Sequence, residues 1–118
     1  MKKRSVKENN RKLILDHMRY SEIISVAEIS ELVEISKPTV KKVIDYYVDI
    51  GIVIPAGKGD SSQKGGKKPD LFQFDKDYGY VITFHIGPDF FYAAVMNLAM
   101  ERVFVFHKRI EDIGADEV

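Results

Sequence analysis

The stretch of sequence that decides the fold covers residues 25–51 and reads SVAEISELVEISKPTVKKVIDYYVDIG. Ser25 and Glu28 have the spacing of a capping box, in which each side chain bonds the backbone N–H of the other residue. This pattern predicts a short helix that begins after Ser25 and ends near Glu34-Ile35. Its apolar face comprises Val26, Ile29, Leu32 and Val33.

The sequence predicts a further helix on each side of this one. Ser36 is placed to cap the following helix, and Gly51 ends it. Pro38 lies in the first turn of this helix, where a missing N–H costs nothing. Its apolar stripe at helical spacing consists of Val40, Val43, Ile44 and Tyr47. The preceding helix is predicted over Asn9–Tyr20, with an apolar face formed by Leu13, Ile14, His17 and Met18.

The last two helices, joined by a tight turn, are typical of a helix-turn-helix. The buried stripe of the third helix leaves its N-terminal residues free to enter a DNA major groove and reach base edges. Lysines around that stripe, together with the positive end of the helix dipole, would then meet phosphates. The alternative is a plain three-helix bundle with a solvated lysine face.

Two short apolar strands are predicted next, at Ile52–Pro55 and Leu71–Phe74. The loop between them is rich in glycine and lysine, as expected of a wing that lies along a DNA groove or backbone. The alternative for this loop is a disordered linker. The order of helices, glycine stop, strand and basic loop favours a winged helix-turn-helix DNA-binding domain over residues 1–75. The residues predicted to contact DNA are Ser25, Ser36, Lys37, Thr39, Val40, Lys41, Lys42, Lys58, Lys64, Lys67 and Lys68.

The composition fits this interpretation. The net charge is zero, but residues 1–68 contain 14 Lys/Arg and 9 Asp/Glu (net +5), whereas residues 69–118 contain 4 and 9 (net −5). Such a split indicates a basic half that binds polyanions. The chain has no cysteine, no run of apolar residues long enough to span a membrane and no apolar signal segment, so we expect a cytoplasmic protein. His17, His85 and His107 lack metal-ligand spacing, and no catalytic, metal or cofactor site is expected.

Residues 76–118 show strand patterns instead. Tyr80–Ile86, Phe90–Met96 and Arg102–Ile110, separated by short turns, predict a three-stranded antiparallel meander. Strands that are apolar on both faces belong in a sheet covered on both sides. Because the acidic segment 111–118 offers no cover, we expect the chain to be the N-terminal piece of a longer protein. A small intact protein that buries this sheet in a homodimer is the alternative.

This order of features resembles the repressor members of the ROK (repressor, open reading frame, kinase) family. The residues that carry the resemblance are the helix-turn-helix Ser25–Tyr47, the segment Gly65–Pro69 with Leu71–Phe74, and Asp77–Ile82. The resemblance implies an α+β chain in which the winged helix leads into an actin-like, ribonuclease-H-like sugar-kinase domain, with residues 76–118 as its first three strands. It also implies a repressor of sugar-utilisation genes that binds a palindromic operator in double-stranded DNA as a homo-oligomer. A sugar effector would bind only beyond this chain.

One segment departs from the kinase members of that family. Where they have an Asp-Ile-Gly-Gly-Thr phosphate loop, this chain has His85–Asp89, in which Pro88 removes an N–H and Asp89 adds a negative charge. We therefore expect no enzyme activity. Two alternatives stay open: a ROK-family sugar kinase with an appended winged helix, and a winged helix used for protein–protein contact.

Overall fold

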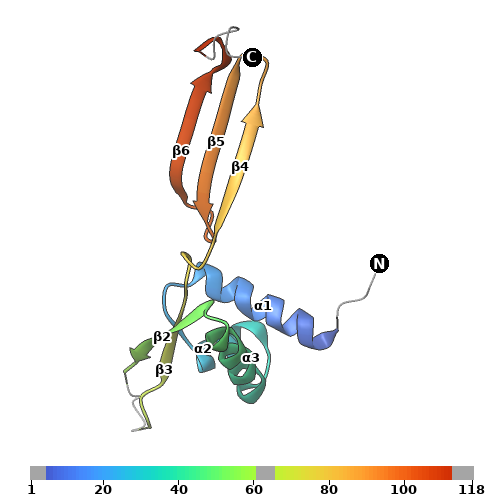
Figure 1. The fold of residues 1–118 in the computed structure, drawn as a ribbon. Helices are drawn as coiled ribbons and strands as arrows, with labels where there is room; N and C mark the ends of the chain where they lie inside the picture. Colours follow the sequence, from blue (N-terminus) through green and yellow to red (C-terminus); the bar gives the residue numbers. More distant parts are fainter. Residues whose placement is uncertain (1–4, 61–65, 113–118) are drawn as a thin grey trace. The chain divides into compact units, whose positions relative to one another are not determined.

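The computed structural model describes residues 5–60 and 66–112, and a boundary between two compact units falls between Asp75 and Lys76 (Figure 1). The first unit contains α1 (Val6–Tyr20), β1 (Ile24–Ser25), α2 (Val26–Val33), α3 (Lys37–Asp49), β2 (Val53–Lys58) and β3 (Asp70–Phe74). The second contains β4 (Tyr80–Ile86), β5 (Phe90–Asn97), β6 (Arg102–Arg109) and the short 3-10 helix η1 (Ile110–Asp112). The predicted combination of helices and antiparallel sheets is confirmed.

The first helix begins earlier than predicted. The backbone N–H of Glu8 donates to the Ser5 hydroxyl over 3.2 Å, and the Ser5 N–H donates to the Glu8 carboxylate over 2.9 Å. This capping box starts α1 at Val6, so the predicted start at Asn9 is wrong by three residues. The Ser5-to-Glu8 spacing is the same signal that locates the start of α2 and could have been recognised.

The ends of α2 and α3 follow from individual residues. The capping box of Ser25 and Glu28 is confirmed, with reciprocal hydrogen bonds of 3.2 and 3.1 Å. Ser36 occupies the N-cap position of α3, but its hydroxyl donates to the Thr39 hydroxyl over 3.0 Å and makes no capping bond. Gly51, with φ of +87°, follows the helix in the left-handed conformation that glycine adopts without strain.

The core of the first unit lies between the three helices and a small antiparallel sheet of order β1-β3-β2. Its fully buried side chains are Ile14, Met18, Ile29, Val40, Ile44 and Val53. Strand β1 was not predicted, because a two-residue strand has no periodicity; it pairs with β3 at Ile24 and Phe72. Strand β2 is longer than predicted and continues past a register shift between Pro55 and Lys58, where Gly57 has φ of +89°.

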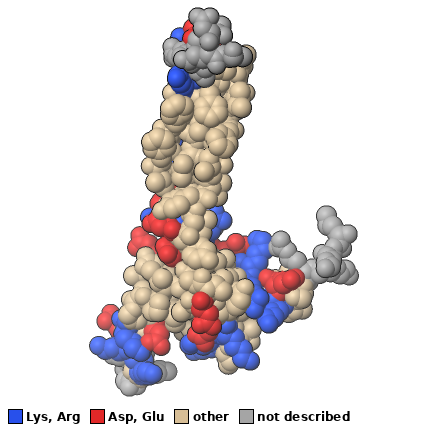
Figure 2. All heavy atoms as spheres, viewed as in Figure 1, with Lys and Arg blue, Asp and Glu red and all other residues tan. Residues whose placement is uncertain are grey.

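The second unit is an antiparallel meander of order β4-β5-β6. Its strand bounds agree with the predicted ones to within one residue. Every residue of β4 and β6 is exposed, and the central strand β5 is mostly half-buried, with Ala94 and Asn97 buried. In the view of Figure 2, this sheet carries few charged side chains along most of its length.

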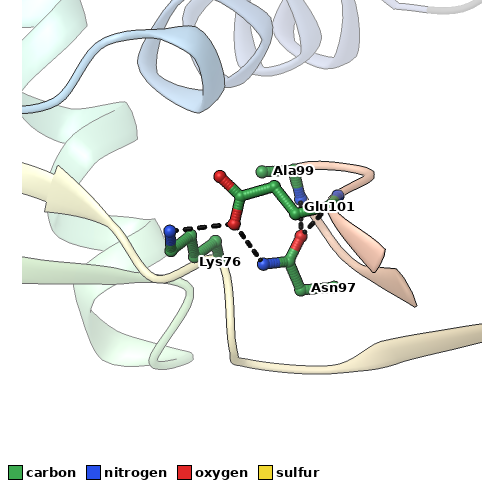
Figure 3. A network of polar contacts seen from close by, with 4 residues as sticks. All are labelled: Lys76, Asn97, Ala99 and Glu101. Carbon is green, nitrogen blue, oxygen red and sulfur yellow. Dashed lines mark hydrogen bonds and ion pairs between the residues drawn. The ribbon is translucent and has the colours of Figure 1, made fainter. Parts of the chain in front are cut away.

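A polar cluster closes the turn between β5 and β6 (Figure 3). The Asn97 side chain, only 3% exposed, accepts hydrogen bonds of 3.0 Å from the backbone N–H groups of Ala99 and Glu101. Its amide donates to the Glu101 carboxylate over 2.8 Å, and Lys76 reaches the same carboxylate at 2.9 Å. This ion pair lowers the pKa of Glu101 and raises that of Lys76. One buried amide thus organises the turn that the sequence predicts at Asn97–Glu101.

In the part of the chain that the structure describes, no helix is both long and apolar enough to cross a membrane. Among the same residues, no group of three or more His, Asp or Glu side chains is arranged to hold a metal ion.

Candidate nucleic-acid interface

The N-terminal half of α3 presents lysines to solvent because the other side of the helix is anchored in the core. Val40, Val43, Ile44 and Tyr47 are buried, as their spacing predicted. Lys37 and Lys41, four residues apart, therefore share one exposed flank of the helix. The Tyr47 hydroxyl donates to the backbone carbonyl of Arg11 over 2.8 Å, which ties α3 to α1, and burial raises the pKa of this phenol.

The β2–β3 hairpin brings a second set of lysines to the same flank. Beyond the paired residues Lys58 and Asp70, the ladder continues with a hydrogen bond of 2.8 Å from the Gly59 N–H to the Pro69 carbonyl. A side chain at Gly59 would come within 3.1 Å of the Pro69 ring, so glycine allows this close approach. Lys67 and Lys68 directly precede this pairing and are exposed.

These two segments line one open groove of about 430 Å³ beside α3. Lys37 and Lys41 come from α3, Lys67 and Lys68 from the hairpin, and the apolar floor includes Val26, Ala27, Pro38 and Pro69. Figure 2 shows basic side chains gathered on the first unit, with acidic side chains among them. Four cations that are up to 31 positions apart in sequence thus face one surface.

One carboxylate, Asp70, lies within this lysine groove. The Lys58 ammonium donates a hydrogen bond to the Asp70 carboxylate, and this bond and the charge of Lys58 lower the pKa of Asp70. The charges of Lys67 and Lys41, which line the groove, lower that pKa further. Lys41 itself forms an ion pair with Asp45, one helical turn further along α3. Because these pairs are exposed, each contributes little to stability.

The structure places the predicted contact residues in different surroundings. Lys37, Lys41, Lys67 and Lys68 line the groove, whereas Lys58 lies outside it, paired with Asp70. Ser36 is exposed at the start of α3. Thr39 is half-buried, and with Lys42 it lines another groove. Lys64 lies outside the described residues.

The prediction that Ser25 and Val40 contact DNA is not kept, because both are buried. The side chain of Val40 is 0% exposed and belongs to the core. Ser25 is 4% exposed, and its hydroxyl is used to cap α2. Both were chosen because they lie near the start of a helix, although the sequence pattern already placed Val40 in the apolar stripe of α3 and gave Ser25 the capping role of α2.

Sequence reasoning also missed a second groove, of about 420 Å³, on the α1 side of α3. It is lined by Val6, Lys7, Asn10, Arg11, Thr39, Lys42 and Val43. The Arg11 guanidinium carbon lies 3.7 Å from the centre of the Tyr46 ring, a cation–π contact that restrains this side chain. The i, i+4 spacing of Lys7 and Arg11 was a visible signal, but only the tertiary structure brings it beside α3.

The segment His85–Asp89, which departs from the kinase phosphate loop, comprises the end of β4 and the tight turn of residues 87–89 between β4 and β5. The Gly87 N–H donates to the Phe90 carbonyl over 2.8 Å, and Pro88 has no N–H. The His85 ring stacks on Phe90 with ring centres 5.2 Å apart. Neither Gly87 nor Pro88 therefore offers a backbone donor to a phosphate.

No protein-family model matches the chain. The chain is 34% identical over 112 residues to a xylose repressor of Caldicellulosiruptor bescii, covering 95% of the chain and 27% of the relative. It is 30% identical over 106 residues to the xylose repressor of Bacillus spizizenii, covering 90% of the chain and again 27% of the relative. The chain thus spans about a quarter of the length of the curated relatives it matches.

A solved structure has a similar fold. It is a ROK family transcriptional regulator, described as a homologue of the E. coli MLC protein. The two structures superpose with a TM-score of 0.63 at 15% sequence identity, over 88% of this chain and 26% of the chain of the regulator. At this identity the match shows that the two proteins share a fold. The family assignment rests on the sequence similarity to the xylose repressors. The chain belongs to the ROK family of regulators and corresponds to the N-terminal portion of such a protein.

Proposed function

We propose that this chain is the DNA-binding portion of a transcriptional repressor of sugar-utilisation genes. The observation that carries the proposal is the lysine groove, in which Lys37 and Lys41 of α3 face Lys67 and Lys68 of the hairpin. Phosphate contacts supply most of the affinity of DNA-binding proteins, and a cationic surface beside an exposed helix start is suited to make them. The sugar-related role is taken from relatives that are named xylose repressors.

In this proposal, α2 and α3 form a helix-turn-helix, and the β2–β3 hairpin is the wing of a domain covering residues 1–75. The start of α3 enters the major groove, where Thr39 and Lys41 reach base edges. Lys67 and Lys68 bind phosphates. A two-fold homo-oligomer would present two copies of α3 to a palindromic operator, and residues 76–118 would open a sugar-kinase-like domain.

The alternative of a sugar kinase with an appended winged helix is less well supported. Phosphate loops bind through free backbone N–H groups, and the turn at 87–89 uses the Gly87 N–H internally and has a proline next to it. The matched relatives are named repressors and a transcriptional regulator. The alternative of pure protein–protein contact predicts that the groove lysines do not affect DNA binding.

The test begins with fragments that the chain enriches from a random-sequence DNA pool. We expect Thr39→Ala to weaken binding to the enriched site by about 1–3 kcal/mol, and binding to random DNA much less, because it removes a base contact. Lys67→Gln should weaken binding to both DNAs by the same factor, because it removes only a phosphate contact. Fluorescence anisotropy titrations measure both.

Lys12→Gln is the matched control, since Lys12 is an exposed α1 residue outside the lysine groove. If Thr39→Ala and Lys67→Gln had the same profile on the two DNAs, the assigned roles would be wrong. If neither changed the affinity, the protein–protein alternative would replace the proposal.

A further inference from the structure

The two flanks of α3 are both cationic, but they are built from different elements. With 3.6 residues per turn, Lys37 and Lys41 lie on the flank that faces the hairpin. Thr39, Lys42 and Tyr46 lie on the other, which faces α1. The groove on this second flank, between α1 and α3, is called the α1–α3 groove.

The α1–α3 groove is suited to an anion. Its lining in the described part of the chain contains three cations, Lys7, Arg11 and Lys42, and no carboxylate. The lysine groove on the other flank, by contrast, contains Asp70. Asn10 adds a neutral amide that can donate hydrogen bonds.

Arg11 is held in place before any ligand binds. Its guanidinium lies over the Tyr46 ring at 3.7 Å, and its backbone carbonyl accepts the Tyr47 hydroxyl at 2.8 Å. A side chain restrained in this way loses less conformational entropy when it binds a phosphate than a free arginine does. The α1–α3 groove thus contains a positioned cation as well as an excess of positive charge.

The geometry of DNA indicates which anion this is. A helix about 10–12 Å across nearly fills a major groove about 12 Å wide. The phosphates of one DNA strand therefore lie along one side of the helix, and the phosphates of the other strand lie along its other side. If α3 occupies a major groove with the hairpin along one strand, the opposite strand passes the other flank of α3. The α1–α3 groove lies on that flank.

We propose that the α1–α3 groove is a second phosphate-binding site, in which Lys7, Arg11 and Lys42 bind the DNA strand opposite the one contacted by the hairpin. This inference rests on the proposed function. It assigns to α1 a direct part in DNA binding, in addition to its packing role. The recognition helix is then held between two phosphate contacts, one on each flank.

The test measures the dependence of affinity on salt for the chain and the double variant Lys7→Gln/Arg11→Gln. Each lost phosphate contact should reduce the slope of log affinity against log salt by about one, and the affinity by about five-fold at about 0.15 M salt. The double variant should therefore lose about two from the slope, equally on random DNA and on the enriched site. Arg11→Lys keeps the charge and should keep the slope.

The matched control is Lys12→Gln, which removes the positive charge next to Arg11 in sequence. Lys12 forms an ion pair with Asp16 at 2.7 Å and does not line the α1–α3 groove. This variant should leave the slope close to that of the unmodified chain. Thermal unfolding of each variant shows whether the fold is kept. A loss of slope in Lys7→Gln/Arg11→Gln that Arg11→Lys also shows would point to a packing role of Arg11 and overturn the inference.

The outcomes separate this inference from the proposed function. An unchanged slope in Lys7→Gln/Arg11→Gln, together with a reduced slope in Lys67→Gln, overturns the second site and leaves DNA binding by the hairpin flank intact. No salt-dependent binding by the unmodified chain would remove the proposed function, and the inference with it.

Discussion

The core isoleucines of the first unit and the isoleucines of strand β4 in the second unit occupy opposite environments. Ile14, Ile29 and Ile44 in the first unit are 0% exposed, whereas Ile82 and Ile86 in the second are 59% and 72% exposed. The first unit closes a core between three helices and a small sheet, and its surface carries lysines. The second is a single sheet with exposed apolar side chains. The comparison teaches that the first unit buries a core of its own, whereas the second unit leaves many of its apolar side chains exposed.

The sheet of the second unit also carries aromatic side chains that contact one another but are not buried in a core of that unit. Phe84 and Phe91 lie with ring centres 5.9 Å apart, and Phe91 and Phe106 6.1 Å apart, so an aromatic row crosses the three strands. Phe84 and Phe106 nevertheless remain 66% and 42% exposed. Cross-strand pairs of this kind contribute about 0.2–1 kcal/mol each, much less than burial of a complete side chain.

The largest expected effect comes from the same substitution made once in each unit. Ile44→Ala should lower the free energy of unfolding by about 2–5 kcal/mol, because it leaves a cavity in a closed core. Ile82→Ala, at a side chain that is 59% exposed, should change it by less than about 0.5 kcal/mol. Amide hydrogen exchange, followed separately in α3 and β5, measures the two effects. Equal losses would show that the sheet faces are buried in solution, and the contrast between the units would fail.

A smaller effect distinguishes the units by charge. Asp70 and Glu101 are both exposed carboxylates whose pKa is lowered by a lysine, Lys58 and Lys76 respectively. Both therefore stay ionised at neutral pH, and any stability they add is lost only as the pH falls through their lowered pKa.

Asp70→Asn removes a negative charge from the lysine groove and frees Lys58, so DNA affinity should rise by up to about five-fold at about 0.15 M salt.

Glu101→Gln is the control for that change, because it frees a lysine of the second unit. It should leave DNA affinity unchanged when both variants are titrated under the same conditions. An equal rise in affinity for Glu101→Gln would mean that the second unit also contributes to the DNA-binding surface, and the assignment of binding to the first unit would have to be revised.

Much of the fold could be predicted because single residues determine where elements begin and end. Ser25 with Glu28 locates the start of α2, and Gly51 the end of α3. Strand β1 could not be predicted, since only its pairing with β3 defines it. The continuation of β2 depends on Gly57, which in sequence is typical of a loop.

The candidate site was harder to predict than the fold. The lysines of α3 were identified from helical spacing, but Ser25 and Val40 were also named as DNA contacts, although the same spacing gave Ser25 a capping role and Val40 a place in the apolar stripe, and both are buried. The α1–α3 groove was missed, because Lys7 and Arg11 come to line a groove with α3 residues only when α1 packs beside α3. Local signals give the positions of charges along the chain, whereas a site requires knowledge of which helix faces are covered.

The central claim is that DNA binds to the cations of the first unit, and the salt dependence of affinity tests it most directly. If the chain neutralises about four to six phosphates, log affinity should fall with log salt with a slope of about −4 to −5, doubled for a dimer. Lys67→Gln/Lys68→Gln should reduce the slope by about two, whereas Lys108→Gln/Arg109→Gln, in β6 of the second unit, should leave it unchanged. A slope near zero, or equal losses from the two double variants, would contradict the account.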